Sequence, residues 1–332
     1  MVITRTPFRI SFFGGGTDYP EFYKEHGGSV ISTTFDKYCY VTVRHLPRFF
    51  DYSNQVTYSR IENTKTVDEI QHPAVREAMK YLDMHELRIG YDADLPARSG
   101  IGSSSSFAVG MLNSFHALKG QYVDKMQLAK EAIHLERVLC NESGGIQDQI
   151  ATSFGGFNRI RFTNDDIVVS PVIISNERKE RLNSNLMLFF TGFSRFSGQI
   201  ASKQKEAVKD KIKDLLEINN LVNEAEKILT SKGDLNDFGK LLDYTWRLKR
   251  GIIDCITNDS LDAIYERALK HGAIGGKLLG AGGGGFFLFY VEQDRQEELK
   301  KELKDFLYVP FRFEDIGTHT LYYKAESYPP EW

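Results

Sequence analysis

The apolar residues of this chain follow two periods, one of two residues and one of three to four, which predicts a mixture of strands and helices. In the first half, residues 3–13, 38–44 and 87–91 are rich in β-branched and aromatic side chains, which is typical of strands. Residues 159–174 predict two more strands that flank an Asn-Asp-Asp turn.

Two helices are predicted in the same half. One begins at residues 103–106, a run of four serines, because apolar residues recur every three or four positions from there to Leu118. The other begins after Asp124, which forms a capping-box pattern with Gln127, and should run to about Leu139.

The second half repeats this mixture in a new block. An apolar strand at residues 186–190 precedes charged amphipathic helices over residues 208–229. After a glycine-rich run come a strand at 286–291, a helix at 295–306 and a strand around 320–323. We therefore predict an α+β fold with two domains, residues 1–180 and 181–332.

Composition narrows the function classes. The chain has 332 residues, 41% of them hydrophobic, and a net charge of −3, so neither nucleic acid nor a membrane is an expected partner. The three cysteines, Cys39, Cys140 and Cys255, are far apart and predict no disulfide or zinc framework. No signal core or apolar span is present, so we expect a cytoplasmic protein that acts on small molecules. The sequence leaves open whether it forms a homodimer.

The segment from Leu95 to Phe107 has the composition of a phosphate-binding loop. Gly100 and Gly102 allow close backbone approach, and the serines that follow lie at a predicted helix N-terminus, whose free N–H groups and dipole favour anions. We therefore predict that Gly100, Gly102, Ser103, Ser104 and Ser105 bind the phosphates of a nucleotide. The alternative is a plain serine-capped helix.

A second glycine-rich segment, at residues 275–285, contains the spacing Gly-x-Gly-x-x-Gly at Gly280, Gly282 and Gly285. A dinucleotide-binding fingerprint follows a strand and opens a helix, whereas here the strand comes after the glycines. The Rossmann interpretation is therefore disfavoured. A tight turn into a strand is the alternative for these glycines, and it is compatible with a phosphate contact because both need glycine.

These two segments and residues 6–19 resemble, in order and spacing, the three motifs of the GHMP kinases, the family of galactokinase, homoserine kinase, mevalonate kinase and phosphomevalonate kinase. The resemblance implies an N-terminal nucleotide-binding α+β domain, a C-terminal ferredoxin-like α+β domain and an active site in the cleft between them. It also implies ATP as phosphoryl donor with Mg²⁺ as cofactor. By the same resemblance, the ATP phosphates are contacted by Gly280, Gly282, Gly283 and Gly284.

The catalytic residues are also assigned by resemblance. Residues 144–151, preceded by Glu136, resemble the family segment that carries a catalytic aspartate and a magnesium-binding glutamate. Asp148 would then take the proton of the acceptor hydroxyl, Arg9 would lie beside it, and Ser104 and Glu136 would hold Mg²⁺. An arginine beside an aspartate favours the charged carboxylate that a base requires. The alternatives are a helix cap for Asp148, a solvent-facing helix charge for Glu136 and a strand salt bridge for Arg9.

The first motif differs from that of galactokinase at the positions that grip the sugar. Gly15 and Gly16 stand where galactokinase has Glu and His, while Thr17 and Asp18 are kept. This variant most resembles the branch of the family that phosphorylates the anomeric hydroxyl of D-glycero-D-manno-heptose 7-phosphate. The predicted substrate contacts are Gly15, Gly16, Thr17, Asp18 and Gly145.

A sugar that already carries a phosphate needs a basic pocket, and Arg195 is the first candidate because it lies in a glycine-flanked loop after a predicted strand. Arg98 and Lys203 are the others, and a solvated surface arginine is the alternative for Arg195. Fucokinase activity is the nearest competing function. A non-catalytic sugar sensor on a kinase fold is a competing function of another class.

Overall fold

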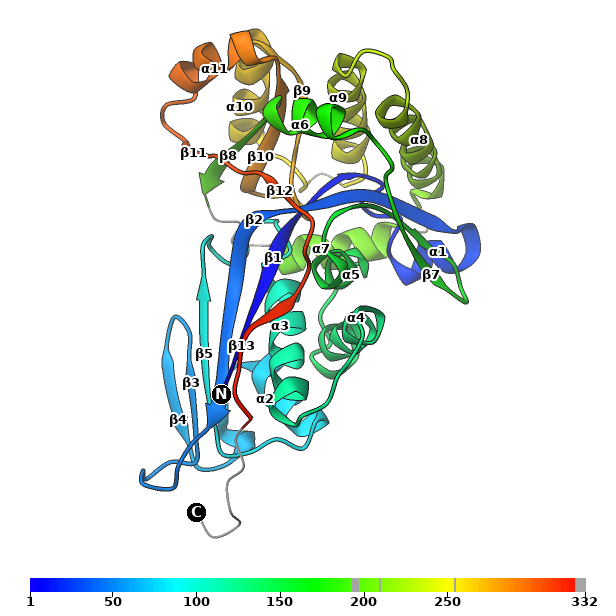
Figure 1. Cartoon of the computed structure of the whole chain (residues 1–332). Coiled ribbons are helices and arrows are strands. Elements are labelled where there is room, and N and C mark those ends of the chain that lie inside the picture. The colour runs from blue at the N-terminus through cyan, green and yellow to red at the C-terminus, as the bar shows by residue number, and fades with distance from the viewer. Residues whose placement is uncertain (193–196, 209, 254, 326–332) are drawn as a thin grey trace.

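A computed structural model describes residues 1–192, 197–208, 210–253 and 255–325 of the chain. It contains two β-sheets, one of nine strands and one of four, and each has helices packed against it (Figure 1). No helix in these ranges is long and apolar enough to cross a bilayer.

The nine-stranded sheet is built mainly from the first half of the chain. Its main path runs β13-β1-β2-β5-β3-β4, and β6, β7 and β12 extend it from β2. The long strand β2 pairs with β1 along one edge and with β5 and then β6 along the other. The strands formed by the first half are β1 (Val2–Phe13), β2 (Gly28–His45), β3 (Asn54–Thr57), β4 (Ile61–Thr64), β5 (Leu87–Ala93), β6 (Phe157–Phe162) and β7 (Ile167–Pro171).

Helix α3 packs against the centre of this sheet and begins with the predicted serines (Figure 1). A Cβ at Gly110 would lie 2.7 Å from Thr6 Oγ1, so glycine lets the helix approach the strands closely. Helix α4 starts at its Asp124 cap, as predicted. The helical elements of this half are α1 (Pro20–His26), η1 (Val67–Glu69), α2 (Pro73–Tyr81), α3 (Ser103–Leu118), α4 (Lys125–His134), the π-helical turn η2 (Leu135–Leu139), α5 (Gln147–Phe154) and α6 (Asn176–Ser184).

The four-stranded sheet is antiparallel and has the order β11-β8-β10-β9. This order, with helices between its first two and last two strands, is the ferredoxin-like arrangement that the family resemblance implied. Its strands are β8 (Leu186–Gly192), β9 (Ala273–Leu278), β10 (Gly285–Val291) and β11 (Leu307–Val309). The helical elements of this half are α7 (Ser197–Ala207), α8 (Ile212–Thr230), α9 (Asn236–Arg250), α10 (Asp259–Lys270), η3 (Gln293–Arg295) and α11 (Gln296–Glu302).

The last two strands return to the first sheet. β12 (Phe313–Glu314) pairs with β2, and β13 (His319–Tyr323) pairs with β1. The final strand was predicted correctly as a strand, but it does not belong to the sheet of residues 181–332. The division at residue 180 therefore stays a prediction that the returning tail complicates, because the tail completes the N-terminal sheet.

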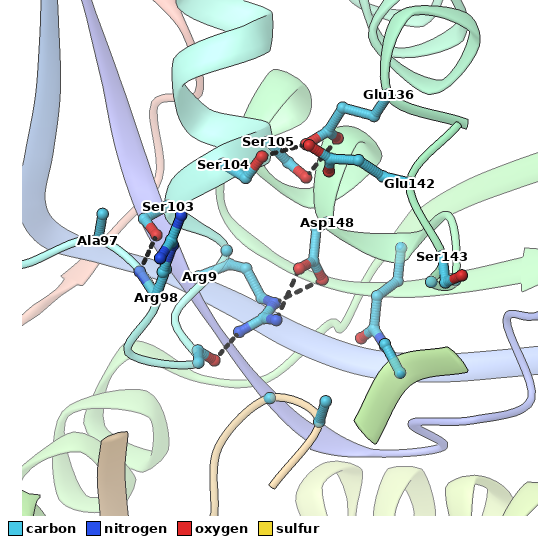
Figure 2. Close-up of a pocket in the computed structure, with 18 of the residues that line it drawn as sticks. Arg9, Ala97, Arg98, Ser103, Ser104, Ser105, Glu136, Glu142, Ser143 and Asp148 are labelled. Atoms are coloured by element: carbon cyan, nitrogen blue, oxygen red, sulfur yellow. Dashed lines mark hydrogen bonds and ion pairs between the residues drawn. The ribbon is translucent and has the colours of Figure 1, made fainter. Parts of the chain in front are cut away.

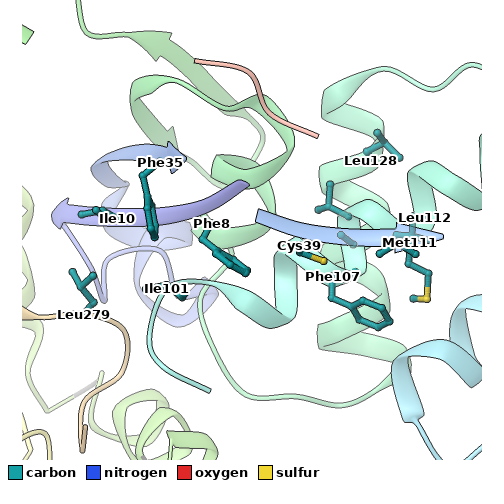
Figure 3. Packing of buried hydrophobic residues seen from close by; sticks show 14 of the residues in the cluster. Phe8, Ile10, Phe35, Cys39, Ile101, Phe107, Met111, Leu112, Leu128 and Leu279 are labelled. Carbon is teal, nitrogen blue, oxygen red and sulfur yellow. The ribbon is translucent and has the colours of Figure 1, made fainter. Parts of the chain in front are cut away.

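The main apolar core runs across both halves. Phe8, Ile10 and Phe35 of the first sheet pack near Ile101 of the serine loop and Leu279 of the glycine segment (Figure 3). Phe12 and Phe13 also meet Phe238 of α9 in edge-to-face contacts. Through Ile101 and Leu279, the two glycine-rich segments are therefore anchored in the same close-packed core.

Candidate active site

The serine loop forms the N-terminus of α3 with two glycines in left-handed conformations. Gly100 has φ +84° and Gly102, the residue before the helix, has φ +75°, values that favour glycine. The Ser103 hydroxyl accepts a hydrogen bond from the Arg98 backbone N–H at 3.2 Å. The result is an open helix N-terminus that faces a cavity and suits an anion.

The second glycine segment packs directly on this loop. A Cβ at Gly280 would lie 2.5 Å from Gly100 Cα, and one at Gly285 would lie 2.3 Å from the Ser99 carbonyl oxygen. Only glycine therefore permits the contact between the two loops. Gly280 lines the cavity beside the loop, as the predicted phosphate contact requires.

Gly282, Gly283 and Gly284 lie elsewhere. None of the three lines the cavity, and the Gly283 N–H donates to the Ile256 carbonyl at 2.9 Å. A Cβ at Gly282 would lie 2.6 Å from the same carbonyl oxygen. In this conformation Gly282 and Gly283 pack against the segment after α9, so their predicted phosphate contacts are corrected to packing contacts, and Gly284 does not line the cavity either.

Arg9 and Asp148 form a two-pronged ion pair at the centre of the site (Figure 2). Arg9 Nε and Nη2 each donate to a different Asp148 oxygen at 2.7 Å, and Nη1 donates to the Gly100 carbonyl at 2.7 Å. Arg9 is buried, whereas the Asp148 side chain keeps 23% of its surface exposed. The carboxylate is thus fixed in direction and open to the cavity, and its side chain is not a helix cap.

Glu136 lies on the π-helical turn η2 and points toward the start of α3 (Figure 2). Its carboxylate accepts hydrogen bonds from Ser104 Oγ at 2.5 Å and Ser105 Oγ at 2.8 Å, and a close one from Gln149 Nε2. Short π-helical turns inside α-helices often mark functional sites. With 1% exposure, Glu136 is not the solvent-facing charge that was the alternative.

Glu142 is a second carboxylate at this point, which the sequence did not single out (Figure 2). Burial raises its pKa, and the nearby Glu136 charge adds to the effect. The described residues contain no group of three or more His, Cys, Asp or Glu side chains that could hold a metal alone. A carboxylate with an adjacent hydroxyl nevertheless fits Mg²⁺, which takes few protein ligands and completes its shell with water and phosphate oxygens.

The predicted sugar-binding residues separate into two groups. Asp18 lines the cavity at 2% exposure and accepts hydrogen bonds from the Gly16 and Gln147 N–H groups, both at 3.1 Å. A Cβ at Gly145 would lie 1.9 Å from Asp18 Oδ2, so this glycine makes the space that the carboxylate fills. Burial raises the Asp18 pKa, and the Asp148 charge raises it further.

Thr17 faces the other way. It is fully buried, and its hydroxyl donates to the Gly14 carbonyl at 2.8 Å and to the Ser29 carbonyl at 3.0 Å. Its predicted role as a sugar contact is therefore corrected to that of a residue that holds the turn. Gly15 and Gly16 line the cavity, and their contact with a sugar stays a prediction.

The site residues surround one cavity of about 1200 Å³ between the two halves of the chain. Ser11 contributes a hydroxyl with no hydrogen-bond partner among the described residues, and Gln147 contributes an unpaired amide oxygen. At another part of the wall Tyr58, His72 and Phe107 form a chain of ring contacts with centroids 5.0 and 5.3 Å apart. The cavity thus combines an aromatic part with a strongly polar part.

Two buried lysines of the second half also line the cavity, and no sequence signal pointed to either. Lys249, in the last turn of α9, is 8% exposed and donates to the Gly280 carbonyl at 2.5 Å. Lys277, on β9, is 4% exposed and donates to the Phe12 carbonyl at 2.8 Å. Burial and the Arg9 charge lower the Lys249 pKa to about 8, and burial and the Lys249 charge lower that of Lys277.

The three residues predicted to contact a substrate phosphate differ in where they lie. Arg195 lies outside the described residues. Arg98 lines the cavity beside the serine loop, with φ +59°, while Lys203 is exposed on α7 and does not line it. The structure therefore gives no support to Lys203 as a contact of the substrate phosphate.

Comparison with known proteins identifies the family. Residues 69–156 match the model of the GHMP kinase N-terminal domain, and residues 224–309 match that of the GHMP kinase C-terminal domain. The two matches cover more than half of the chain, which therefore belongs to the GHMP kinases. It is a phosphotransferase with an alcohol acceptor, more specifically a sugar kinase of this family.

Individual relatives point in the same direction. The chain is 29% identical to the D-glycero-alpha-D-manno-heptose 7-phosphate kinase of Campylobacter jejuni over 91% of this chain and 92% of that protein. It is 25% identical to the bifunctional fucokinase/GDP-fucose pyrophosphorylase of Arabidopsis thaliana, over 90% of this chain and 31% of that protein. A D-glycero-D-manno-heptose 1-phosphate kinase from Bacteroides thetaiotaomicron has the same fold, with a TM-score of 0.72 and 24% identity over 98% of this chain and all of that one.

Proposed function

We propose that this sugar kinase transfers the γ-phosphoryl group of ATP to the anomeric hydroxyl of D-glycero-D-manno-heptose 7-phosphate, giving the 1,7-bisphosphate for nucleotide-activated heptose. The observation that carries the proposal is the acceptor end of the cavity. There Asp18 is retained, and Gly15 and Gly16 leave space where galactokinase has two large side chains. The likeness to the Campylobacter enzyme along nearly the whole chain supports the same choice.

Asp148 is the proposed general base. Its carboxylate is held by Arg9 and remains open to the cavity, so it can accept the proton of a hydroxyl bound beside it. Arg9 also contacts the serine loop through Gly100, which places its positive charge between the base and the proposed phosphate site. Phosphoryl transfer depends mainly on such positioning and charge neutralisation.

The phosphates of ATP are proposed to bind at the N-terminus of α3, between Gly100, Gly102 and Gly280. Ser104 and Glu136 would hold Mg²⁺, with Glu142 close by. When bound, the ion would neutralise charge on the transferred group. Ser104 Oγ and Glu136 Oε1 are in direct hydrogen-bond contact, so both lie within reach of one ion.

The aromatic part of the cavity suits the nucleotide base. Tyr58, His72 and Phe107 form an apolar wall, and burial lowers the His72 pKa and so favours its neutral form. A neutral, largely apolar wall is what a planar base requires.

The proposal is tested by supplying ATP–Mg²⁺ with heptose 7-phosphate, fucose, galactose and mannose in turn and measuring ADP release. We expect the highest kcat/KM for heptose 7-phosphate. A preference for fucose would replace the heptose assignment with the fucokinase one. Absence of turnover with every sugar, together with sugar binding, would support a sensor, although Asp148, Glu136 and Ser104 are all present and assembled.

A further inference from the structure

Lys249 and Lys277 bring two amino groups into the interior of the cavity wall. Each ammonium group donates to a backbone carbonyl, and neither forms an ion pair with a carboxylate among the residues that the structure describes. An ammonium has three N–H donors, and the one carbonyl bond found for each lysine in the described part of the chain leaves donors for a ligand.

The two lysines lie beside further charges from the opposite domain. The Arg9 charge lowers the pKa of both lysines. Asp18 and Asp148 act on Lys249 in the opposite direction, but Asp148 is already paired with Arg9. The Lys249 charge is therefore repelled by Arg9 and has no ion-pair partner among the described residues, and an anion bound beside it would relieve this repulsion.

We infer that Lys249, supported by Lys277, binds a phosphate group in the acceptor half of the cleft. The inference rests on the proposed function and extends it from the sugar ring to the charge that the sugar carries. Lys249 donates a hydrogen bond to the carbonyl of Gly280, which packs on Gly100 of the serine loop. Lys249 also lines the same cavity as Asp18 and Asp148. A phosphate at this position would bind at the boundary between the two domains.

The phosphate has two sources. It is either the phosphate that the acceptor already carries or the phosphoryl group that passes from ATP to the sugar. Measuring acceptor binding without ATP distinguishes these two sources. Under that condition the phosphate on the acceptor is present, whereas the phosphoryl group of ATP is not.

The experiment compares the wild type with Lys249→Met, which removes the charge and keeps the length of the side chain. Lys249→Arg retains the charge as a second variant. Lys240→Met is the matched control, because Lys240 lies on the same helix, is exposed and pairs with Asp237. Calorimetry without ATP gives the Kd values of heptose 7-phosphate, heptose and inorganic phosphate, and steady-state kinetics gives kcat for both sugars.

If the acceptor phosphate is the ligand, Lys249→Met weakens heptose 7-phosphate at least tenfold and leaves heptose unchanged, and Lys249→Arg recovers part of the loss. If the transferring group is the ligand, acceptor Kd values stay constant and kcat falls at least tenfold with both sugars. Either result supports the site. Values equal to those of Lys240→Met in every measurement would overturn it.

The experiment distinguishes failure of the proposed function from failure of the lysine site. If the wild type phosphorylates none of the sugars yet binds inorganic phosphate more tightly than Lys249→Met does, the heptose assignment falls and the lysine site stands. The melting temperature supplies a further readout. A lysine with a purely structural role would lower it when replaced, whereas removal of a buried charge kept for a ligand should leave it unchanged or raise it.

Discussion

Arg9 and Asp148 face each other across the interface between β1 and α5, and each of two guanidinium nitrogens lies 2.7 Å from a different carboxylate oxygen. The third nitrogen of the same guanidinium contacts the serine loop. One arginine therefore links the strand, the proposed base and the proposed phosphate site. This connection brings residues that are 139 positions apart in the sequence into one site.

Asp148→Asn tests the proposed base. Asparagine keeps the size of the side chain but cannot accept the proton, so kcat should fall by ~10²–10⁴-fold. The Kd of ATP and the melting temperature should change little by comparison. Asp165→Asn, in the exposed turn between β6 and β7, is the control. Near-native turnover of the Asp148 variant would remove the assignment.

Ser104→Ala tests the proposed metal site. Because Ser104 Oγ lies against Glu136, its loss should raise the magnesium concentration needed for half-maximal activity. Ser106 is the control on the same helix turn, because its fully buried hydroxyl donates to the Pro7 and Gly102 carbonyls instead. Ser106→Ala should therefore affect stability more than the magnesium requirement. An equal magnesium requirement in the two variants would contradict the site.

Gly145→Ala tests the position of Asp18. The new methyl group would lie 1.9 Å from Asp18 Oδ2, so the carboxylate must move. We expect the KM of the sugar to rise at least tenfold while the Kd of ATP stays near that of the wild type. Gly90→Ala, whose nearest contact would be an ordinary 3.9 Å from Thr42, is the control. Unchanged sugar kinetics would show that Asp18 does not orient the acceptor.

The lowered pKa of Lys249 predicts how the stability of the protein depends on pH. The pKa of this lysine falls from 10.5 to about 8 on folding. Below pH 8 it is protonated in both states, and the full cost of burying the charge lowers stability. Between pH 8 and 10.5 the unfolded state binds the extra proton, so stability rises with pH. Lys249→Met should therefore melt higher than the wild type at pH 7, and the difference should shrink toward pH 10.

The same titration affects activity in the opposite direction. As the pH rises through about 8, the free wild type loses the Lys249 charge, and kcat/KM for the phosphorylated acceptor should fall. Lys249→Arg should lack this limb because arginine stays protonated. A pH profile that is identical in the wild type and in Lys249→Arg would contradict the role of Lys249.

The sequence predicted well what depends on local pattern. The serines at the start of α3, the Asp124 cap of α4 and most strands follow from periodicity and capping, which act over a few residues. The return of β13 to β1 was missed because strand pairing between residues 2–5 and 319–323 leaves no local signal.

Site residues show the same division. Arg9, Asp148, Glu136 and Asp18 were found through motifs, and the structure brings them to one cavity. Thr17 was misassigned because a motif does not show which way a side chain points. Lys249 was missed because in sequence it belongs to a charged helix end that is typical of a solvated surface, and its burial beside Gly280 depends on contacts between distant segments.

The central claim is that this sugar kinase phosphorylates the anomeric hydroxyl of a heptose that already carries a phosphate at carbon 7. The most direct measurement is ³¹P NMR of the product formed from ATP–Mg²⁺ and heptose 7-phosphate, with kcat/KM compared between this acceptor and unphosphorylated heptose. We predict a new phosphate at carbon 1 and a preference of at least tenfold for the phosphorylated acceptor. Phosphate at another carbon, or equal use of the two acceptors, would contradict the claim.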